Sequence, residues 1–465
     1  DQWKKLFQQV PLIQAWRFKN VNSDYVNFAT EDKNCYLSSS VTFCENIFYS
    51  YGVDRSKNIV DSFFIDKSEW CYENLDSQNN YNGVFLKNCS NCIDSFFLFD
   101  CINCQNCFLS SNLRNKSYVF KNVQYSKIDY EAKISEINLG KFLVFNELIF
   151  LFFEMIKKSS IHKYIQKINT INCSGNNILN SKNINYSFNV NNSENSKYAI
   201  RMSNSKDCMD IFGIIQTELA YESVAPSFQG SNAQFCAMNR ACSNIKYSSY
   251  CNNSSNLFAC IGLKNKSYCI LNKQYTKEEY EELVPKIIQH MNDKPYIDKK
   301  GRIYKYGEFF PGELSPFAYN ETIAQEYFPL TKEQALEKGY NWKDKKERNY
   351  SIDIKAEDIP DDIKDVDDTI LNKVIECSHK ECNHQCTEAF KIILDELQFY
   401  KRMNLPLPRL CPNCRHHNRL KQRNPLKLWH RKCMKEGCSN EFETSYSPDR
   451  PEIVYCEQCY NKEIY

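Results

Sequence analysis

Residues 89–107 read CSNCIDSFFLFDCINCQNC, and this stretch contains a unit that recurs along the N-terminal part of the chain. The unit is a polar residue, usually Asn, Lys or Asp, followed by Cys, Tyr or Ile and then by another apolar residue. The second residues of nine successive units span 93 positions in eight steps, which is about 12 residues per step. This spacing is typical of short strands joined by tight turns. These positions are Tyr25, Cys35, Ile47, Ile59, Cys71, Tyr81, Cys92, Cys107 and Tyr118.

A second series with the same rhythm follows and covers 95 residues in eight steps. Its positions are Cys173, Tyr186, Tyr198, Cys208, Tyr221, Cys236, Tyr247, Leu257 and Tyr268. The two series also match each other at an offset of 149, and at an offset of 150 near their ends. The pairs at 149 include Tyr49 with Tyr198, Asp61 with Asp210, Glu69 with Glu218 and Glu73 with Glu222. Two tandem copies of one array explain these matches.

Short strands with one inward residue per repeat predict a mainly-β chain of two tandem, duplicated β-solenoid-like blocks with packing helices. Identical positions would stack at the strand spacing of about 4.8 Å, so the inward column should be a ladder of Cys, Tyr, Ile and Phe. Asn tolerates the left-handed backbone of tight turns, which explains how a chain with only 12 Gly turns so often. Ser126 and Thr276 are predicted to cap a helix at the end of each copy.

Changes of pattern divide the chain into five parts. The first block is expected over 1–134, a helical connector over 135–170 and the second block over 171–291. The connector contains an apolar run shorter than the roughly 20 residues of a membrane span, so we expect a helix packed over an open solenoid end and no membrane role. An irregular wrap with an acidic linker is expected over 292–370, and a zinc-ribbon tail over 371–465.

Composition excludes some classes of protein. The 59 Lys and Arg nearly balance the 57 Asp and Glu, and neither G-x-G-x-x-G nor G-x-x-x-x-G-K-[ST] occurs. We therefore expect no nucleotide cofactor. Cysteine pairs beside basic residues, without a signal-peptide pattern, favour a reducing, cytoplasmic compartment and metal over disulfides. Asp1 is not an initiator methionine, so residues before it are expected.

The strongest chemical signal lies in the tail, where nine of the 24 Cys follow residue 376. Two turns that each present two thiolates can complete a tetrahedron around one ion. The predicted ligands of two Zn²⁺ ions are Cys382, Cys386, Cys411, Cys414, Cys433, Cys438, Cys456 and Cys459, with Cys377 as a spare ligand. Sequential pairing is expected, and interleaving of Cys411/Cys414 with Cys433/Cys438 is the alternative. Both sites are predicted to be closed and structural.

The stretch 401–432 carries ten Lys and Arg and no Asp or Glu. Basic charge interleaved with aromatic residues is typical of phosphate contact and base stacking. The residues predicted to bind nucleic acid are Arg415, Arg419, Lys421, Arg423, Arg431 and Trp429. Two other interpretations stay open, namely contact with a protein and docking on the acidic linker at 352–368, whose net charge is −6.

Ligand spacing also occurs inside the first block, at Cys89, Cys92, Cys101, Cys104 and Cys107. These cysteines coincide with or adjoin repeat positions, so packed thiols are the favoured interpretation. Catalysis by a cysteine would need a nearby histidine, and the first 376 residues contain only His162 and His290. The repeated Asp61, Asp94 and Asp210 are expected to make corner hydrogen bonds.

The motifs LPLPRLCPNCR at 405–415, YSPDRP at 446–451 and LKNKSY at 263–268 resemble those of one family. It comprises zinc-ribbon repeat proteins that are abundant in small-genome candidate-phylum bacteria, and the resemblance covers nearly the whole length. It implies zinc at the cysteine pairs and no established activity. Members typically also carry an N-terminal zinc ribbon, so the resemblance implies that this sequence begins inside a longer chain.

Together these features predict a non-enzymatic zinc-binding scaffold or adaptor that recognises a macromolecular partner, protein or nucleic acid, through its basic tail. A nucleic-acid-binding protein, for RNA or DNA, is the first alternative. The second alternative is an enzyme with a site in a groove between the blocks, which a pocket containing acids and either His290 or the segment Tyr306–Tyr319 would favour.

Overall fold

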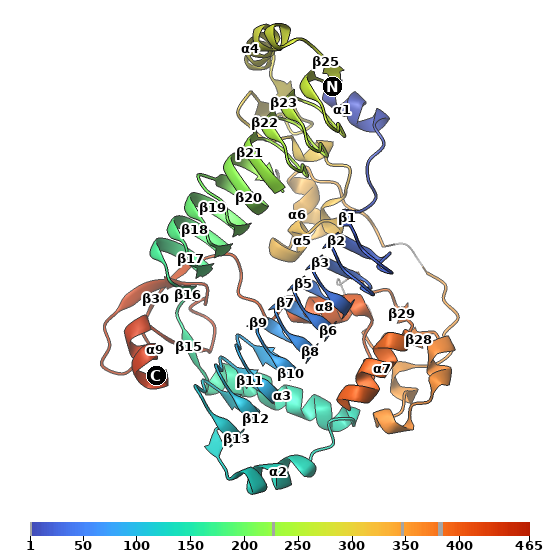
Figure 1. Cartoon of the computed structure of the whole chain (residues 1–465), viewed down its shortest axis with the longest axis vertical. Helices are drawn as coiled ribbons and strands as arrows, with labels where there is room; N and C mark the ends of the chain where they lie inside the picture. Colours follow the sequence, from blue (N-terminus) through green and yellow to red (C-terminus); the bar gives the residue numbers. More distant parts are fainter. Residues whose placement is uncertain (1, 226–227, 346–347, 380–384) are drawn as a thin grey trace.

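A computed structural model of the protein describes residues 2–225, 228–345, 348–379 and 385–465 (Figure 1). Strands make up 37% of the chain, which confirms a mainly-β protein. Most of them belong to two large sheets, which we call the first stack (residues 17–124) and the second stack (residues 167–274). The blue first stack and the green second stack lie at an angle to each other in Figure 1.

The first stack is a 14-stranded sheet with a constant register. Each parallel pair joins residues 12 positions apart, as in Tyr81 with Ile93 and Val41 with Val53. One repeat of 12 residues therefore forms one layer of the stack, which we call a row. Its strands are β1 (Arg17–Phe18), β2 (Val26–Thr30), β3 (Ser38–Thr42), β4 (Glu45–Phe48), β5 (Tyr51–Asp54), β6 (Lys57–Val60), β7 (Phe63–Asp66), β8 (Glu69–Tyr72), β9 (Leu75–Gln78), β10 (Tyr81–Lys87), β11 (Ile93–Phe99), β12 (Gln105–Ser111), β13 (Ser117–Phe120) and β14 (Val123–Gln124).

The second stack has ten strands, and most of its parallel pairs keep the step of 12. The step is 11 from the pair Lys167–Ile178 to the pair Cys173–Ile184, and it is 13 where Ile215 pairs with Phe228. The step of 13 lies between the sequence matches at an offset of 149 and those at an offset of 150. The second series therefore has one more residue than the first in this row. The strands are β16 (Lys167–Ile168), β17 (Ile171–Leu179), β18 (Lys182–Asn191), β19 (Glu194–Ser203), β20 (Met209–Val224), β21 (Phe228–Gln234), β22 (Ser243–Lys246), β23 (Ser255–Phe258), β24 (Ser267–Ile270) and β25 (Lys273–Gln274).

A left-handed residue occurs at every third position of these rows. Between residues 43 and 64 the φ angles of such residues lie between 44° and 70°, at Phe43, Asn46, Tyr49, Gly52, Arg55, Asn58, Asp61 and Phe64. The residue that follows each of them is buried, as Ile47, Ser50 and Val53 are. Each 12-residue row therefore contributes four side chains to the interior of the stack. Asn and Asp adopt the left-handed conformation more readily than other non-glycine residues, which is why they recur at these corners.

The expected inward ladder of Cys, Tyr, Ile and Phe is wrong in its aromatic members. Cys35 and Ile47 are buried, but Tyr25 and Tyr81 are 66% and 44% exposed. Because a buried position recurs every third residue, the interior is narrow, and its apolar clusters consist of Val, Ala, Ile, Leu and Cys. The Tyr and Phe side chains lie on the outside, where they are free to bind helices and loops.

Polar ladders run along the outside of both stacks. Asn22, Asn34, Asn46 and Asn58 are joined by amide hydrogen bonds of 2.9, 3.1 and 2.8 Å. A charged ladder alternates in sign, and in the first stack it consists of Lys33, Glu45, Lys57 and Glu69. The second stack repeats it as Lys182, Glu194, Lys206 and Glu218. Directly opposed amides and opposite charges stabilise neighbouring rows of a sheet.

Serine and cysteine side chains inside the stacks hydrogen-bond to the backbone of their own and neighbouring rows. The hydroxyl of Ser50 donates to the carbonyl of Phe48 at 2.9 Å and accepts from the N–H of Ser62 at 3.0 Å, one row further on. The thiol of Cys89 donates in the same way to the carbonyl of Lys87 at 3.3 Å. Burial raises the pKa of Cys71 to about 12, so its thiol stays protonated at neutral pH. The closely spaced cysteines of residues 89–107 belong to this packed interior.

A helix follows the last hairpin of each stack. Ser126 accepts a hydrogen bond from the N–H of Asp129, and Thr276 accepts one from the N–H of Glu279, each at 3.2 Å. The prediction that these two residues cap helices is therefore confirmed. The helices are α2 (Lys127–Ser135) and α4 (Lys277–Asp293).

Helix α3 (Phe142–Lys158) packs along the first stack beside β11 and β12, not over an open end as expected (Figure 1). The aromatic residues outside the stack provide the surface for it, since the ring of Phe145 lies 5.8 Å from that of Phe85. The acidic linker holds the start of the helix. The carbonyl and the carboxylate of Asp361 accept from the N–H groups of Phe142 and Leu143 at 2.8 and 3.0 Å, and an acid at a helix N-terminus is favourable.

Among the helices of the described residues, none combines the length and the apolar character needed to cross a membrane.

Short elements connect and cover the stacks. In the wrap, Tyr306, Phe309 and Phe310 pack against the aromatic outside of the second stack. The remaining helices and strands are α1 (Gln2–Gln9), β15 (Ile161–Lys163), β26 (Tyr296–Ile297), β27 (Ile303–Tyr304), α5 (Ala324–Tyr327), α6 (Lys332–Glu337), β28 (Ile375–Glu376), β29 (Ala389–Phe390), α7 (Leu394–Met403), α8 (Pro412–Leu420), β30 (Trp429–Lys432), β31 (Glu441–Thr444), β32 (Ile453–Tyr455) and α9 (Glu457–Ile464).

Candidate metal centres and the docking of the tail

Four thiols of the tail gather into one group, formed by Cys377, Cys386, Cys411 and Cys414. Their sulfur atoms lie within 4.8 Å of one another, and all four side chains are buried. Cys411 is the N-cap of α8 and Cys414 lies in its first turn, with Pro412 at the first helical position. The Sγ of Cys377 accepts a hydrogen bond from the backbone N–H of Cys411 at 3.2 Å. Amide hydrogen bonds of this kind stabilise the thiolate form that a metal requires.

The first group differs from the predicted set in one member. Cys377, predicted as a spare ligand, lies in the group, whereas Cys382 lies outside the described residues. The other three members are those predicted. The two groups follow one another in the sequence, so the structure does not bring Cys411/Cys414 together with Cys433/Cys438 as the interleaved alternative requires.

Cys433, Cys438, Cys456 and Cys459 form the second group, again with sulfur atoms within 4.8 Å. Cys433 follows β30, and Cys456 caps α9. Burial acts to raise the pKa of Cys456, but hydrogen bonds from Asn440 and from the backbone of Cys459 lower it to about 7. Among the residues that the structure describes, each group consists of four thiols, with no carboxylate or imidazole. This donor set fits a closed tetrahedral site for a thiophilic metal, and the protein has two four-cysteine groups compatible with two metal sites.

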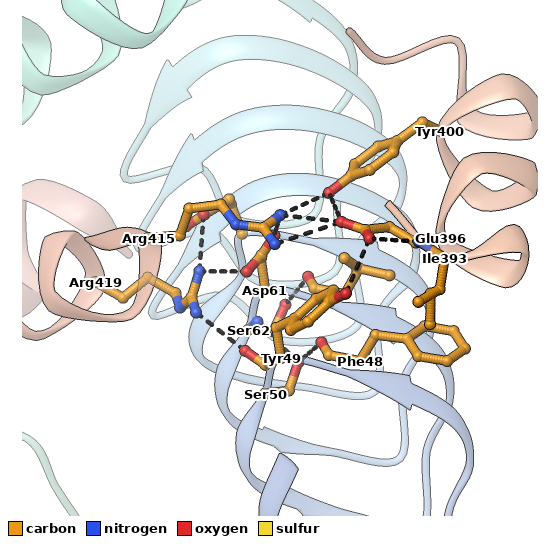
Figure 2. Close-up of polar contacts among 12 residues, drawn as sticks. Phe48, Tyr49, Ser50, Asp61, Ser62, Ile393, Glu396, Tyr400, Arg415 and Arg419 are labelled. Carbon is orange, nitrogen blue, oxygen red and sulfur yellow. Dashed lines mark hydrogen bonds and ion pairs between the residues drawn. The ribbon is translucent and has the colours of Figure 1, made fainter. Parts of the chain in front are cut away.

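Helix α8 carries two arginines whose side chains are buried against the outside of the first stack (Figure 2). Arg415 lies 2.5 Å from the carboxylate of Asp61, and Arg419 lies 2.9 Å from Asp61 and 2.9 Å from Glu73. Arg415 also donates to the hydroxyl of Tyr400 in α7 at 2.8 Å and lies 3.3 Å from Glu396. Asp61 and Glu396 are fully buried, and the arginines are 4% and 1% exposed. The tail is therefore joined to the first stack by a buried network of ion pairs.

The network contains three carboxyl groups and two guanidinium groups. Burial raises the pKa of Glu73 to about 7, although Arg419 opposes the shift. Burial also raises the pKa of Glu396. Burial thus favours the protonated forms of both glutamates, whereas the neighbouring arginines favour their charged forms. Burial acts to lower the pKa of Arg415, but Asp61, Tyr400 and Glu396 together raise it well above its usual value, so the guanidinium stays charged.

The prediction that Arg415 and Arg419 belong to an exposed nucleic-acid-binding face is wrong. Both side chains are buried, and both form ion pairs with Asp61 of the first stack. Arg423 stacks on Phe63 and Phe64, with its guanidinium carbon 4.7 and 4.9 Å from the ring centres. Arg431 is half-buried and donates to the carbonyl of Ser447. Of the other predicted residues, Lys421 is exposed and Trp429 is half-buried.

Docking on the acidic linker accounts for only part of the basic run. Lys401 lies 2.8 Å from Asp368, and Arg409 donates to the backbone carbonyls of Ile359 and Pro360 at 2.8 and 3.0 Å. Most of the binding to the tail comes instead from the first stack. The twelve-residue spacing of Tyr49, Asp61 and Glu73 was the signal in the sequence that could have identified this surface.

The second half of the tail binds where the two stacks meet. Strand β32 pairs in parallel with β15 of the connector, through Val454 and His162 among others. The hydroxyl of Tyr460 in α9 donates to Asp100 of the first stack, next to an ion pair of 3.1 Å between Asp100 and Arg114. The tail thus contacts the first stack through α8 and α9 and the connector through β32.

His162 offers a pH-dependent test of this junction. Its Nδ1 lies 3.0 Å from the hydroxyl of Tyr446, its Nε2 lies 2.8 Å from the carbonyl of Ile156, and burial lowers its pKa to about 4. In the unfolded chain the imidazole of His162 takes up a proton near pH 6.5. The contribution of the buried, neutral imidazole to stability is therefore full above pH 6.5 and is lost as the pH falls towards 4. Below pH 6.5 we expect a loss approaching about 1.4 kcal/mol per pH unit, which His162→Gln should abolish.

Denaturant unfolding at pH 7, 6 and 5 measures this slope for both proteins. The same replacement at the exposed His430 is the control and should keep the slope of the original protein. An unchanged slope in His162→Gln would show that the junction opens before the histidine titrates.

A scan of the chain against protein-family models finds no match, and a search of curated proteins finds none. The resemblance to zinc-ribbon repeat proteins of candidate-phylum bacteria therefore stays a prediction.

Proposed function

We propose that the protein is a non-enzymatic, zinc-binding scaffold or adaptor that presents two β-solenoid blocks and its tail to a macromolecular partner. The observation that carries this proposal is the position of the two four-cysteine groups. Cys414 directly precedes the docked Arg415, and Cys459 directly precedes the docked Tyr460. A metal in each group would therefore hold the residues that attach the tail.

The constant 12-residue register supports the solenoid interpretation. Each row places four side chains inside and returns to the same edge, so neighbouring rows present identical columns to the outside. Such columns form a regular surface suited to binding an extended partner or a helix.

Zinc is the metal that we propose for both groups. Four thiolates without an open position are typical of structural zinc sites, which contribute folding energy and no chemistry. A reducing, cytoplasmic location agrees with the free thiols, since the 23 cysteines in the described part of the chain form no disulfide.

Nucleic-acid binding is a second candidate, and it rests on a smaller surface than the sequence predicted. Lys421, Lys427 and Lys432 are exposed, and the ammonium of Lys427 lies 5.1 Å from the ring centre of Trp429. The enzyme alternative has less support, because the two described hollows are small, about 160 and 170 Å³, and neither is lined by His290 or by Tyr306–Tyr319.

The proposed function is tested by purifying the intact protein from native-like cells and measuring its zinc, protein and nucleic-acid content. We expect two zinc ions per chain and a bound macromolecule that separates at a defined salt concentration. Nuclease treatment then distinguishes the two candidates, since a nucleic-acid partner is lost and a protein partner is retained. Less than one zinc ion per chain would contradict the proposal.

A further inference from the structure

The two stacks carry the same column of three residues at the same place. Tyr49, Asp61 and Glu73 lie one row apart in the first stack, and Tyr198, Asp210 and Glu222 lie one row apart in the second, at an offset of 149. All six adopt the left-handed conformation, with φ between 41° and 55°. Corresponding side chains therefore leave the two sheets from equivalent backbone positions. We call these triplets the first and second Tyr-Asp-Glu columns.

The first column binds the arginines of a helix. The two guanidinium groups of α8 are four residues apart, and both contact Asp61 (Figure 2). Arg419 also contacts Glu73. The ring of Tyr49 lies 4.7 Å from the guanidinium carbon of Arg415. A rise of about 6 Å between helix residues four apart is close to the row spacing of about 4.8 Å. The column is thus shaped to receive an Arg-x-x-x-Arg helix.

In the part of the chain that the structure describes, no helix places arginines on the second column. Tyr198 is 48% exposed, whereas Tyr49 is 5% exposed, and Asp210 and Glu222 are only half-buried. Within the described residues, no ion pair reaches Asp210 or Glu222. Glu222 accepts hydrogen bonds from the backbone N–H of Phe309 and from the hydroxyl of Tyr221. Partial burial raises the pKa of both carboxyl groups, which a cationic partner would reverse.

In both stacks, the residues that follow the Tyr-Asp-Glu column in the next rows are covered by other parts of the chain. Beyond Glu73 the first stack continues with Phe85 and Phe97, which lie under α3. Beyond Glu222 the second stack continues with Phe235 and Tyr247, which lie under the segment 306–310. The chain thus covers the aromatic rows of both copies. It buries the Tyr-Asp-Glu rows of the first copy, whereas in the second copy the segment 306–310 reaches Glu222 and leaves Tyr198 and Asp210 partly exposed.

We propose that the second Tyr-Asp-Glu column is a docking site for a helix of a partner protein that carries arginines at positions i and i+4. The anionic column repels phosphate, so it does not suit nucleic acid. The α8 of a second copy is already buried in its own chain. Arginine suits the column better than lysine, because its planar fork can bridge two carboxylates and stack on the Tyr198 ring. The inference deepens the proposed scaffold function by naming the chemistry of its partner.

The test uses the full chain and a synthetic probe peptide of residues 409–423 with Cys411→Ser and Cys414→Ser, constrained as a helix. We expect micromolar binding, with hydrogen-exchange protection at residues 196–224. The chain variant Asp210→Asn/Glu222→Gln should weaken binding about tenfold or more, because each charged hydrogen bond contributes about a tenfold factor. The chain variant Glu218→Gln, on the neighbouring charged ladder, is the matched control and should bind within twofold.

A probe with Arg415→Gln and Arg419→Gln should not bind. Equal affinity of the double variant, protection confined to residues 47–75 of the first stack, or no binding up to about 1 mM would each overturn the inference. Zinc content and melting temperature are measured on the same preparations. A folded protein with two zinc ions that fails to bind the probe would contradict this inference alone, whereas loss of zinc would contradict the proposed function.

Discussion

Replacing Cys411 with serine is expected to release the zinc ion that we propose for the first cysteine group and to detach the tail from the first stack. Cys411 caps α8, so a metal held there fixes the start of the helix that inserts Arg415 and Arg419 beside Asp61. Structural zinc sites contribute about 10–16 kcal/mol of apparent binding free energy in isolated zinc-finger peptides. We therefore expect this variant to lose one zinc ion per chain and most of the stability of the tail.

Metal analysis and hydrogen exchange measure the two effects. Exchange should increase at α7, at α8 and in the rows that hold Tyr49 and Asp61, while the second stack keeps its protection. Cys173→Ser is the matched control, because Cys173 is a half-exposed thiol outside both groups, and its stability should change by about 0.5 kcal/mol or less. A tail that stays protected after complete zinc loss would mean that the arginine network alone holds it.

The number of residues per row could be predicted from the sequence, but the shape of a row could not. A repeat of about 12 residues appears in the chain as a recurring polar-apolar unit, and the register of 12 agrees with it. The buried positions recur every third residue, and many are serines such as Ser50 and Ser62, which a search for apolar positions passes over. Tyr25 and Tyr81 match the recurring unit but face outward, since the pattern does not distinguish the two sides of a left-handed corner.

The candidate metal groups were largely predictable because their members are close in sequence and cysteine pairs have few other roles. The docking network was not, because its partners lie hundreds of residues apart. Arg415 contacts Asp61 across 354 positions, and a run of basic residues has the same composition whether it faces solvent or a buried carboxylate. The repeat pattern alone hints at it, through the twelve-residue spacing of Tyr49, Asp61 and Glu73 and its match in the second series.

The duplication provides a direct measurement of what the docked helix contributes. Asp61→Asn should lower the free energy of unfolding by about 3–5 kcal/mol, because it leaves two buried guanidiniums without their shared carboxylate. Asp210→Asn makes the same change at the equivalent position of the second stack. There the side chain is half-buried and has no ion pair within the described residues, so we expect a change of about 0.5 kcal/mol or less.

Denaturant unfolding of the two variants side by side tests this contrast, and each serves as the control of the other. The backbone is left-handed at both sites, with φ of 52° and 55°, so a cost of asparagine in the fold itself would appear in both. The difference between them therefore reports the charge network and not the folding of the stack. Equal losses would place the role of the carboxylate in the stack itself, and the second column would then need Asp210 for folding instead of keeping it available for a partner.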